Sequence, residues 1–278
     1  MKGIITMKKK YYLELLEKLQ PEKNRPFLRK KAVLIDKLEK AVNGEKLTLA
    51  DEIELVNCIH TSALTGKLED FTSISSSVSE NNVCAARAKN PCSICSKCYA
   101  KQSVEYRSNL KLSLLINHII LNCFDISIEA WKTLSIASVN GKARIESHGD
   151  AASVTASDNM VKIIISHDWL TFGVWTKNHG FYYRTFLKYG KPDNMIFIVS
   201  SDTVNVILEV PEKIRPYIDH VFTVFSLDYV IEHNIEIQCG YHKCKNCLVC
   251  YTKNNTTFYV NEILKSDTKA FKKYMGIE

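Results

Sequence analysis

Short apolar segments alternate with amphipathic ones through much of the chain. Apolar runs of four or five residues are predicted as strands, and the stretches between them have the spacing of helices. The strands cover 71–75, 144–147, 171–175, 195–199 and 221–225, and the helices 102–123, 127–139, 157–167, 182–189 and 227–233. Strands that are separated by roughly 10–20 residues of helix pair in parallel through right-handed crossovers. The sequence therefore predicts an α/β fold, arranged as a partial parallel β/α barrel.

Polar residues close three of these predicted strands. They are Ser147, His148, Gly149 and Asp150 at the first, Lys177 and Asn178 at the second, and Ser200 and Asp202 at the third. Ligands of parallel α/β folds bind at the carboxyl ends of the strands. His148, Asp150 and Lys177 are candidate catalytic residues, because an imidazole, a carboxylate and an amine can transfer protons. The other five are candidates for binding a cofactor.

Some of these residues also have a purely structural interpretation. Gly149 could supply a positive φ in a turn while Asp150 caps the following helix, with no ligand involved. Arg144 opens its strand and is therefore expected to face the opposite end of the sheet. Trp175 is expected to lie in the core.

Eight of the ten cysteines form two sets of four, and each set ends in Cys-x-x-Cys-Tyr. The first set is Cys84, Cys92, Cys95 and Cys98, and the second is Cys239, Cys244, Cys247 and Cys250. A Cys-x2-Cys-x2-Cys run is suited to a cubane iron–sulfur cluster, because one loop can bind three corners. The sequence therefore predicts one or two [4Fe–4S] clusters.

Zinc is the alternative metal for both cysteine sets. Zinc sites normally take two Cys-x-x-Cys or Cys/His pairs from separate knuckles. Such sites would only stabilise the fold. His242 lies inside the second set and could replace a cysteine there. The two remaining cysteines, Cys58 and Cys123, are on apolar helix faces and are predicted as core residues.

Several segments of the chain together resemble one protein family. They are Gly66-Lys67, Thr72 to Ser75, Cys84, Cys92 to Ala100, Arg107 with Asn109-Leu110, Arg144 to Asp150, Phe172 to Asn178, and Cys239 to Tyr251. Over about residues 64–265 the chain is similar to a phage and mobile-element family usually called gene product 88. The resemblance implies a protein of phage or mobile-element type and leaves its activity open.

The layout is also similar to that of radical S-adenosylmethionine enzymes. There, a strand leads into a three-cysteine loop, a partial α/β barrel follows, and a polar motif at the end of the second strand holds the cofactor. The resemblance implies a cluster on Cys92, Cys95 and Cys98 with S-adenosylmethionine bound beside it. Those enzymes use Cys-x3-Cys-x2-Cys, whereas this chain has Cys-x2-Cys-x2-Cys. If Cys84 also binds, no iron stays open for the cofactor.

The net positive charge is confined to the N-terminal part of the chain. Residues 1–50 contain 13 Lys and Arg and 6 Asp and Glu, which gives +7, and the remaining 228 residues contain 24 of each sign. Helical spacing at 8–20, 27–42 and 48–60 predicts a basic helical extension over 1–64. A cysteine-rich α/β core over 65–278 follows, with a second cysteine cluster at 239–250 and a terminal helix.

The basic residues 1–50 have two interpretations. They form either a solvated helix pair or a nucleic-acid surface on which Tyr11, Tyr12 and Phe27 stack on bases. The alternative function is therefore a zinc-bearing nucleic-acid-binding protein with structural cysteine sites.

The sequence predicts a cytoplasmic protein with no membrane partner and a substrate that stays undefined. No apolar run reaches the ~18 residues of a membrane helix. The N-terminus places an apolar patch before its lysines, the reverse of a secretory signal. In a reducing cytosol, cysteines favour metal ligation over disulfides. Neither a Gly-rich phosphate loop nor a Gly-x-Ser-x-Gly nucleophile elbow is present.

Overall fold

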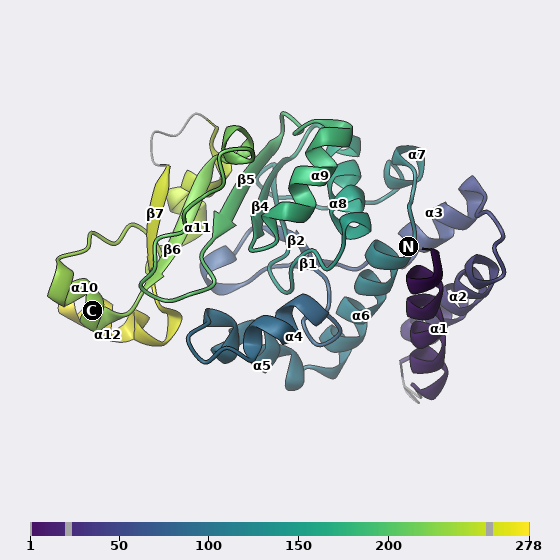
Figure 1. Ribbon diagram of the computed structural model, residues 1–278, viewed down its shortest axis with the longest axis horizontal. Helices are drawn as coiled ribbons and strands as arrows, with labels where there is room; N and C mark the ends of the chain where they lie inside the picture. Colours follow the sequence, from purple (N-terminus) through teal and green to yellow (C-terminus); the bar gives the residue numbers. More distant parts are fainter. Residues whose placement is uncertain (1, 20–23, 254–257, 278) are drawn as a thin grey trace.

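A computed structural model describes residues 2–19, 24–253 and 258–277 as a mixed α/β fold (Figure 1). Within these ranges one sheet of seven strands has its strands in chain order. β1 pairs antiparallel with β2, and each later pair of neighbours is parallel. The strands are β1 (Thr61–Ala63), β2 (Thr72–Ile74), β3 (Lys142–Ile145), β4 (Thr171–Thr176), β5 (Met195–Ser200), β6 (His220–Phe225) and β7 (Tyr259–Ile263). The predicted α/β class and parallel sheet are confirmed.

Helices precede the sheet and connect its strands. They are α1 (Lys2–Lys18), α2 (Arg25–Val42), α3 (Leu49–Cys58), α4 (Asn82–Ala88), α5 (Tyr99–Glu105), α6 (Ser108–Cys123), α7 (Ile128–Trp131), α8 (Val154–Ser166), α9 (His179–Tyr189), α10 (Leu227–His233), α11 (Cys244–Cys247) and α12 (Thr268–Tyr274). Three short 3-10 turns used below are η1 (Gly66–Leu68), η2 (Ile94–Lys97) and η4 (Val249–Tyr251). The end predicted for the first helix, at Gln20 and Pro21, lies outside the described residues. No helix in the described part of the chain is long and apolar enough to cross a membrane.

Two helices differ from the prediction. The helix expected at 102–123 is divided, because Arg107 leaves the helical conformation with φ −127° and ψ 80°. α5 therefore stays with the first cysteine loop, and α6 starts anew against the core. The helix expected at 127–139 ends after one turn, where the Thr133 hydroxyl donates back to the Ala130 carbonyl. The following residues form no regular element, and the Ala137 carbonyl accepts a hydrogen bond from Thr72 in β2.

One face of the sheet packs against the helices. Phe172 and Phe197 are fully buried there and share a core with Ile119 of α6, Met160 of α8 and Tyr182 of α9. This pattern follows from the two-residue period of a strand, which places alternate side chains on the same face. The apolar residues at alternate strand positions are therefore what fixes α6, α8 and α9 over the sheet.

The three N-terminal helices belong to the same core. Leu16, Leu34, Leu38 and Leu55 have no exposed surface and join the cluster that contains α6 and the sheet. Thr48 begins α3 with a capping box, in which its hydroxyl accepts from the backbone N–H of Asp51 and its own N–H donates to that carboxylate. Figure 1 shows α1, α2 and α3 beside α6 at one end of the molecule.

The structure removes part of the support for a nucleic-acid surface on residues 1–50. Tyr12 and Phe27 are buried, so they cannot stack on bases as predicted. Several lysines are also engaged within the protein: Lys30 donates to the Cys58 carbonyl, Lys31 to the Leu19 carbonyl, and Lys37 and Lys40 to Asp51.

The second cysteine segment, residues 239–251, covers the other face of the sheet. Cys239, Val249 and Cys250 pack with Ile198, Phe222 and Val260 of β5, β6 and β7. The Tyr251 ring lies 4.5 Å from the Phe71 ring, which immediately precedes β2. Lys67 of η1 forms a 3.1 Å ion pair with Glu262 of β7. Because these contacts join the two ends of the strand order, the sheet curves around this segment.

Candidate site at the carboxyl ends of the strands

Asp150, which follows β3, connects the ends of β3 and β4 through hydrogen bonds. Its Oδ1 accepts from the Thr176 hydroxyl at 2.6 Å, and its Oδ2 accepts from the backbone N–H of Lys177 at 2.8 Å. Burial raises the pKa of Asp150, although these hydrogen bonds oppose the shift. The predicted helix cap is wrong, because Ser153 caps α8. The predicted positive φ of Gly149 is present, at +85°.

The polar residues after β4 and β5 join the same network. The Lys177 ammonium donates to the Ser200 hydroxyl at 2.5 Å, which connects the ends of these two strands. The side-chain amide of Asn178 donates to the Ala151 carbonyl, also at 2.5 Å. Asp150, Lys177, Asn178 and Ser200 are thus brought together, as parallel strand ends predict.

Ser147 and His148 lie in a neighbouring group of residues. The Ser147 hydroxyl bonds to the hydroxyls of Ser73 and Ser75 at 2.9 Å. His148 instead lies near α5, where its Nε2 is 3.3 Å from the Ser103 hydroxyl. Burial and nearby cations, Arg144 first among them, lower the pKa of His148 to about 4. His148 is therefore neutral near pH 7, and no contact in the described structure joins it to Asp150.

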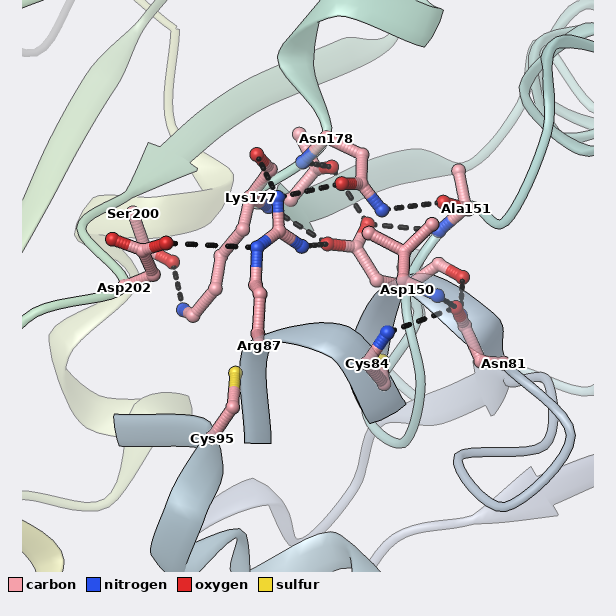
Figure 2. Close-up of polar contacts among 12 residues, drawn as sticks. Asn81, Cys84, Arg87, Cys95, Asp150, Ala151, Lys177, Asn178, Ser200 and Asp202 are labelled. Carbon is pink, nitrogen blue, oxygen red and sulfur yellow. Dashed lines mark hydrogen bonds and ion pairs between the residues drawn. The ribbon is translucent and has the colours of Figure 1, made fainter. Parts of the chain in front are cut away.

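Arg87 of α4 lies at the centre of the strand-end network, and sequence reasoning missed it (Figure 2). Its Nη2 donates to the Lys177 carbonyl at 2.9 Å and to Asn178 Oδ1 at 2.7 Å. Its Nη1 lies 3.8 Å from Asp150 Oδ2, and its Nε lies 3.6 Å from Asp202 Oδ2. The sequence did offer one indication of Arg87: it follows Cys84 by three residues, which places both side chains on one face of a helix.

Glu146 is a second residue that the sequence analysis did not select. It is buried, its φ is +59°, and its carboxylate accepts from the backbone N–H and the hydroxyl of Ser76 at 2.9 and 2.7 Å. Burial raises the pKa of Glu146 to about 8, and the charge of Asp150 adds to the shift, whereas the Ser76 bonds and the charge of Arg144 oppose it. The sequence could have indicated Glu146, because it is an acidic residue at the end of a predicted buried strand and unpaired carboxylates are seldom buried.

The first cysteine set lies in a loop attached to these strand ends. Cys84 is in α4, while Cys92, Cys95 and Cys98 follow in and around η2. The backbone N–H of Ile94 donates to the Asp202 carbonyl at 2.8 Å, and Ser93 forms a β-bridge with Thr203. Burial raises the pKa of the Cys84 thiol, and the charges of Asp150, Cys95, Glu146 and Cys98 add to it. Cys84 is thus within electrostatic range of two other thiols of its set, whereas Cys92 is exposed.

The second cysteine set surrounds one hollow in the inner segment. All four thiol residues line it together with Lys67 and His242. The Lys67 ammonium is 3.3 Å from Cys239 Sγ. The backbone supports this arrangement because Gly240 has φ +110° and Leu248 has φ +56°, two left-handed positions that turn the chain sharply around the hollow.

Arg144 lies inside β3 and not at its start, and its side chain is on the face of the sheet that the second cysteine segment covers. Its guanidinium carbon lies 4.0 Å from the centroid of the Trp175 ring, on the face that the second cysteine segment covers. Trp175 lies 5.7 Å from Tyr251, so it packs against the segment and not in the main helix-side core. The cause is strand register: Ala143 and Ile145 face the helices, so Arg144 between them faces the other way.

The donor set of each cysteine cluster suits a soft metal, since thiolates bind both zinc and iron–sulfur clusters. In the described ranges no three Cys, His, Asp or Glu side chains are arranged so that they could hold a metal ion without moving. The backbone nevertheless brings the four second-set thiols to one hollow. These residues therefore fit a metal centre by their donor chemistry and by lining the same hollow.

The fold and the site define an α/β protein in which one cysteine loop is attached to the strand ends and a second covers a face of the sheet. A model of the protein family described as Gene product 88 matches residues 37–260, which is 224 of 278 residues (260 − 37 + 1). The chain therefore belongs to the Gene product 88 family. No curated protein and no solved structure matches the chain.

Proposed function

We propose that this protein is an iron–sulfur protein with one [4Fe–4S] cluster on the first cysteine set and a second on the other set. The observation that carries the proposal is the attachment of the first cysteine loop to the strand ends, through Ile94 to Asp202 and through Arg87 to four residues. A redox centre on that loop would lie beside Asp150 and Lys177. Ligands of parallel α/β folds bind at this edge of the sheet.

Iron is favoured over zinc by the spacing of the ligands. Each set contains Cys-x2-Cys-x2-Cys, which offers three thiols from one short loop, whereas zinc sites usually combine two separate pairs. Such clusters need reduced thiols, so the cytoplasm is the compartment that we propose.

We further propose an enzyme of the radical S-adenosylmethionine type. When bound, a reduced cluster supplies the electron that breaks a carbon–sulfur bond of that cofactor. The roles of this chain's own residues follow from the network. Lys177, held by Ser200, would bind a carboxylate, and Asn178 and Asp202 would bind hydroxyl or amino groups. Asp150 and Glu146 would hold or accept protons, since burial keeps their pKa values above the ordinary range.

The role of Cys84 decides whether one iron of the cluster would lack a cysteine ligand and so be free to bind the cofactor. Cys84 lies on α4, close to Cys95 and Cys98, and Cys92 is the exposed member of the set. We propose that Cys92, Cys95 and Cys98 bind the cluster and that Cys84 lies beside it. The variant Cys84→Ala should then keep the full iron content. A loss of about four irons per chain would instead identify Cys84 as a ligand.

The first experiment measures iron, sulfide and zinc in protein purified without oxygen. We expect a brown protein that absorbs near ~400 nm, with about four to eight irons per chain. Replacing Cys92, Cys95 and Cys98 by Ala, or Cys244, Cys247 and Cys250 by Ala, should each remove about half of the iron. Cys58→Ala is the matched control, because Cys58 is a buried core residue of α3 outside both sets.

The same preparations test the enzymatic part of the proposal. With dithionite and S-adenosylmethionine, the loaded protein should release 5′-deoxyadenosine, and the first-set variant should not. The second-set variant serves as the comparison, because it lacks only the distant centre. A colourless protein with about two zincs per chain would overturn the iron–sulfur proposal and support structural cysteine sites.

Nucleic-acid binding by residues 1–50 stays a prediction for the zinc alternative. Among the residues of this segment whose side chains the structure describes, the exposed cations are Lys10, Lys18, Arg25, Arg29 and Lys46. If they bind a nucleic acid, affinity should fall steeply with salt, and Lys10→Glu combined with Lys18→Glu should weaken it. Equal binding by this variant would remove the segment from the interface.

A further inference from the structure

We infer that Arg144 is the counter-cation of a thiolate metal centre on the second cysteine set. Its charge stabilises the set when the four cysteines are deprotonated and bound to metal. The inference rests on the proposed function only in requiring that this set binds a metal, and it holds for iron and for zinc alike. It assigns a specific task to a residue outside the ligands and outside the strand-end network.

The position of Arg144 follows from the strand register. Arg144 lies beside Gly173 of β4, and Gly173 lies beside Ile196 of β5, all on the face that the second segment covers. A Cβ atom at Gly173 would approach Trp175 to 2.6 Å and Tyr251 to 2.8 Å, so this glycine makes the room in which the segment packs. The guanidinium stacks on Trp175, and Tyr251, directly after Cys250, lies close to the same ring.

Arg144 is a partly buried guanidinium with few polar contacts. Its Nε and the Tyr251 hydroxyl are buried without a hydrogen bond of good geometry, although the two side chains are close enough for Arg144 to oppose the rise that burial causes in the pKa of Tyr251. No ion pair to a carboxylate is found for Arg144 in the described residues, whereas Arg87 reaches two carboxylates at the strand ends. A guanidinium cannot shed its proton at any ordinary pH, so it requires an anion nearby. Tyr251, Tyr99, Cys244 and Cys250 lie within electrostatic range of Arg144. His148 and Glu146 lie within the same range, but burial raises the pKa of the Glu146 carboxyl to about 8, which favours its neutral form.

A metal centre would supply that anion. Metal binding deprotonates cysteine ligands, and four thiolates outweigh the charge of a divalent zinc ion. A cubane cluster on four thiolates likewise carries surplus negative charge. Lys67, 3.3 Å from Cys239, is the second cation beside the set, but Glu262 already pairs with it. Among the described residues, Arg144 is a cation that interacts with Cys244 and Cys250 and forms no ion pair with a carboxylate.

This role predicts effects of opposite sign in the two states of the protein. Removing the charge of Arg144 should leave the metal-free protein as stable or more stable, because a partly buried cation that forms no ion pair is lost. The same change should destabilise the metal-loaded protein, because the thiolates then lose their counter-cation. A residue that only packs would lower stability equally in both states.

The experiment uses Co²⁺ as the probe in the full-length chain with Cys92, Cys95 and Cys98 replaced by Ser, so that the thiolate charge-transfer band reports the second set. Zn²⁺ competition gives affinities, and melting temperatures are measured with and without metal. We expect Arg144→Met to lower metal affinity roughly 10–100-fold, as loss of a partner around a metal site typically does. Arg144→Lys, which keeps the charge, should retain most of the affinity. Arg215→Met is the matched control, because Arg215 also stacks on an aromatic ring, that of Phe258 at 5.1 Å.

Each outcome decides the inference. Unchanged metal affinity in Arg144→Met, or equal loss of stability with and without metal, overturns it while leaving the proposed metal site intact. Failure of Arg144→Lys to restore binding also overturns it, because charge would then not be the operative property. If the parent chain binds neither Co²⁺ nor Zn²⁺ nor iron at the second set, the proposed function fails there and the inference fails with it.

Discussion

Gly149 is held in a left-handed backbone conformation directly before the buried Asp150. A Cβ atom at this position would lie 2.8 Å from the backbone oxygen of Ser76 and 2.9 Å from the Glu146 carboxylate. The residue therefore meets two constraints, a positive φ and a close backbone approach, and glycine alone satisfies both at low cost. Because Gly149 directly precedes Asp150, its backbone conformation determines the direction of the Asp150 side chain.

Gly149→Ala should destabilise the protein by about 1–3 kcal/mol, because it adds backbone strain and a clash. Urea unfolding of the metal-free, reduced protein measures the change. Gly180→Ala is the control: Gly180 lies in α9 with open space around it, so Ala should be neutral or stabilising. Equal stability of both variants would contradict the strain at Gly149.

Glu146 makes stability depend on pH. Its pKa is raised by burial to about 8 in the folded protein, from an ordinary value near 4.5. The folded state therefore binds more protons than the unfolded state between these values, so its contribution to stability falls as pH rises from about 4.5 to 8. In Glu146→Gln this decline should be smaller, and the variant should exceed the parent in stability at the upper end of the window.

Urea midpoints measured across this pH range test the effect of Glu146. Glu129→Gln provides the matched control, because Glu129 lies at the surface beside Lys132. If Glu146→Gln and Glu129→Gln follow the same pH curve, Glu146 is ionised in the folded protein near neutral pH.

At the scale of elements, α4 connects the first cysteine loop to three strand ends. This helix has seven residues, too few to be stable by itself. It is held at its start by Asn81, whose side chain caps it and donates to the Asp150 carbonyl at 2.7 Å, and near its end by Arg87. Figure 2 shows Arg87 reaching from the helix between Asp150 and Asp202.

Arg87→Met should therefore loosen α4 and the loop that carries Cys92, Cys95 and Cys98. The change leaves the buried Asp150 without its ion-pair partner and removes two hydrogen bonds, at a cost of about 2–4 kcal/mol. Hydrogen exchange over residues 82–98 should accelerate, with little change in α8. Lys89→Met, at an exposed position beyond the same helix, is the control. Unchanged exchange in Arg87→Met would show that the loop is held by other contacts.

At the scale of the whole molecule, the N-terminal helices and the sheet share one core. Four leucines of α1, α2 and α3 are fully buried in the cluster that contains α6. Burying such side chains contributes about 1.5–3 kcal/mol each, which is large against the total stability of a domain.

Deleting residues 1–60 should thus abolish cooperative folding of the remaining chain, because the apolar face of α6 becomes exposed. Thermal unfolding followed by circular dichroism, with size-exclusion chromatography for aggregation, measures the result. Replacing the exposed Lys10 and Lys18 by Glu is the comparison, since it changes charge and leaves the core intact. A truncated chain that melts cooperatively would make residues 1–60 an independent extension.

Much of the fold could be predicted from local pattern. Strands β3 to β6 and helix α10 lie within a few residues of their predicted positions, because apolar periodicity reports which face of an element is buried. The edge strands β1 and β7 were not predicted. β1 has only three residues, and β7 pairs with β6, from which it is separated by the whole second cysteine segment. The convergence of Asp150, Lys177 and Ser200 was predictable as well, because parallel strands bring their carboxyl ends to one edge.

The sequence by itself determined the α/β class, the parallel sheet and the two cysteine sets, because all three depend on spacing along the chain. Only the tertiary structure decided that Arg87 reaches Asp150 across 63 residues (150 − 87), that Arg144 faces the second cysteine segment, and that Tyr12 and Phe27 are buried. These are contacts between side chains that meet only after the sheet has curved and the helices have packed. Strand register and burial determine which side chains meet, and neither can be read from the sequence of a single element.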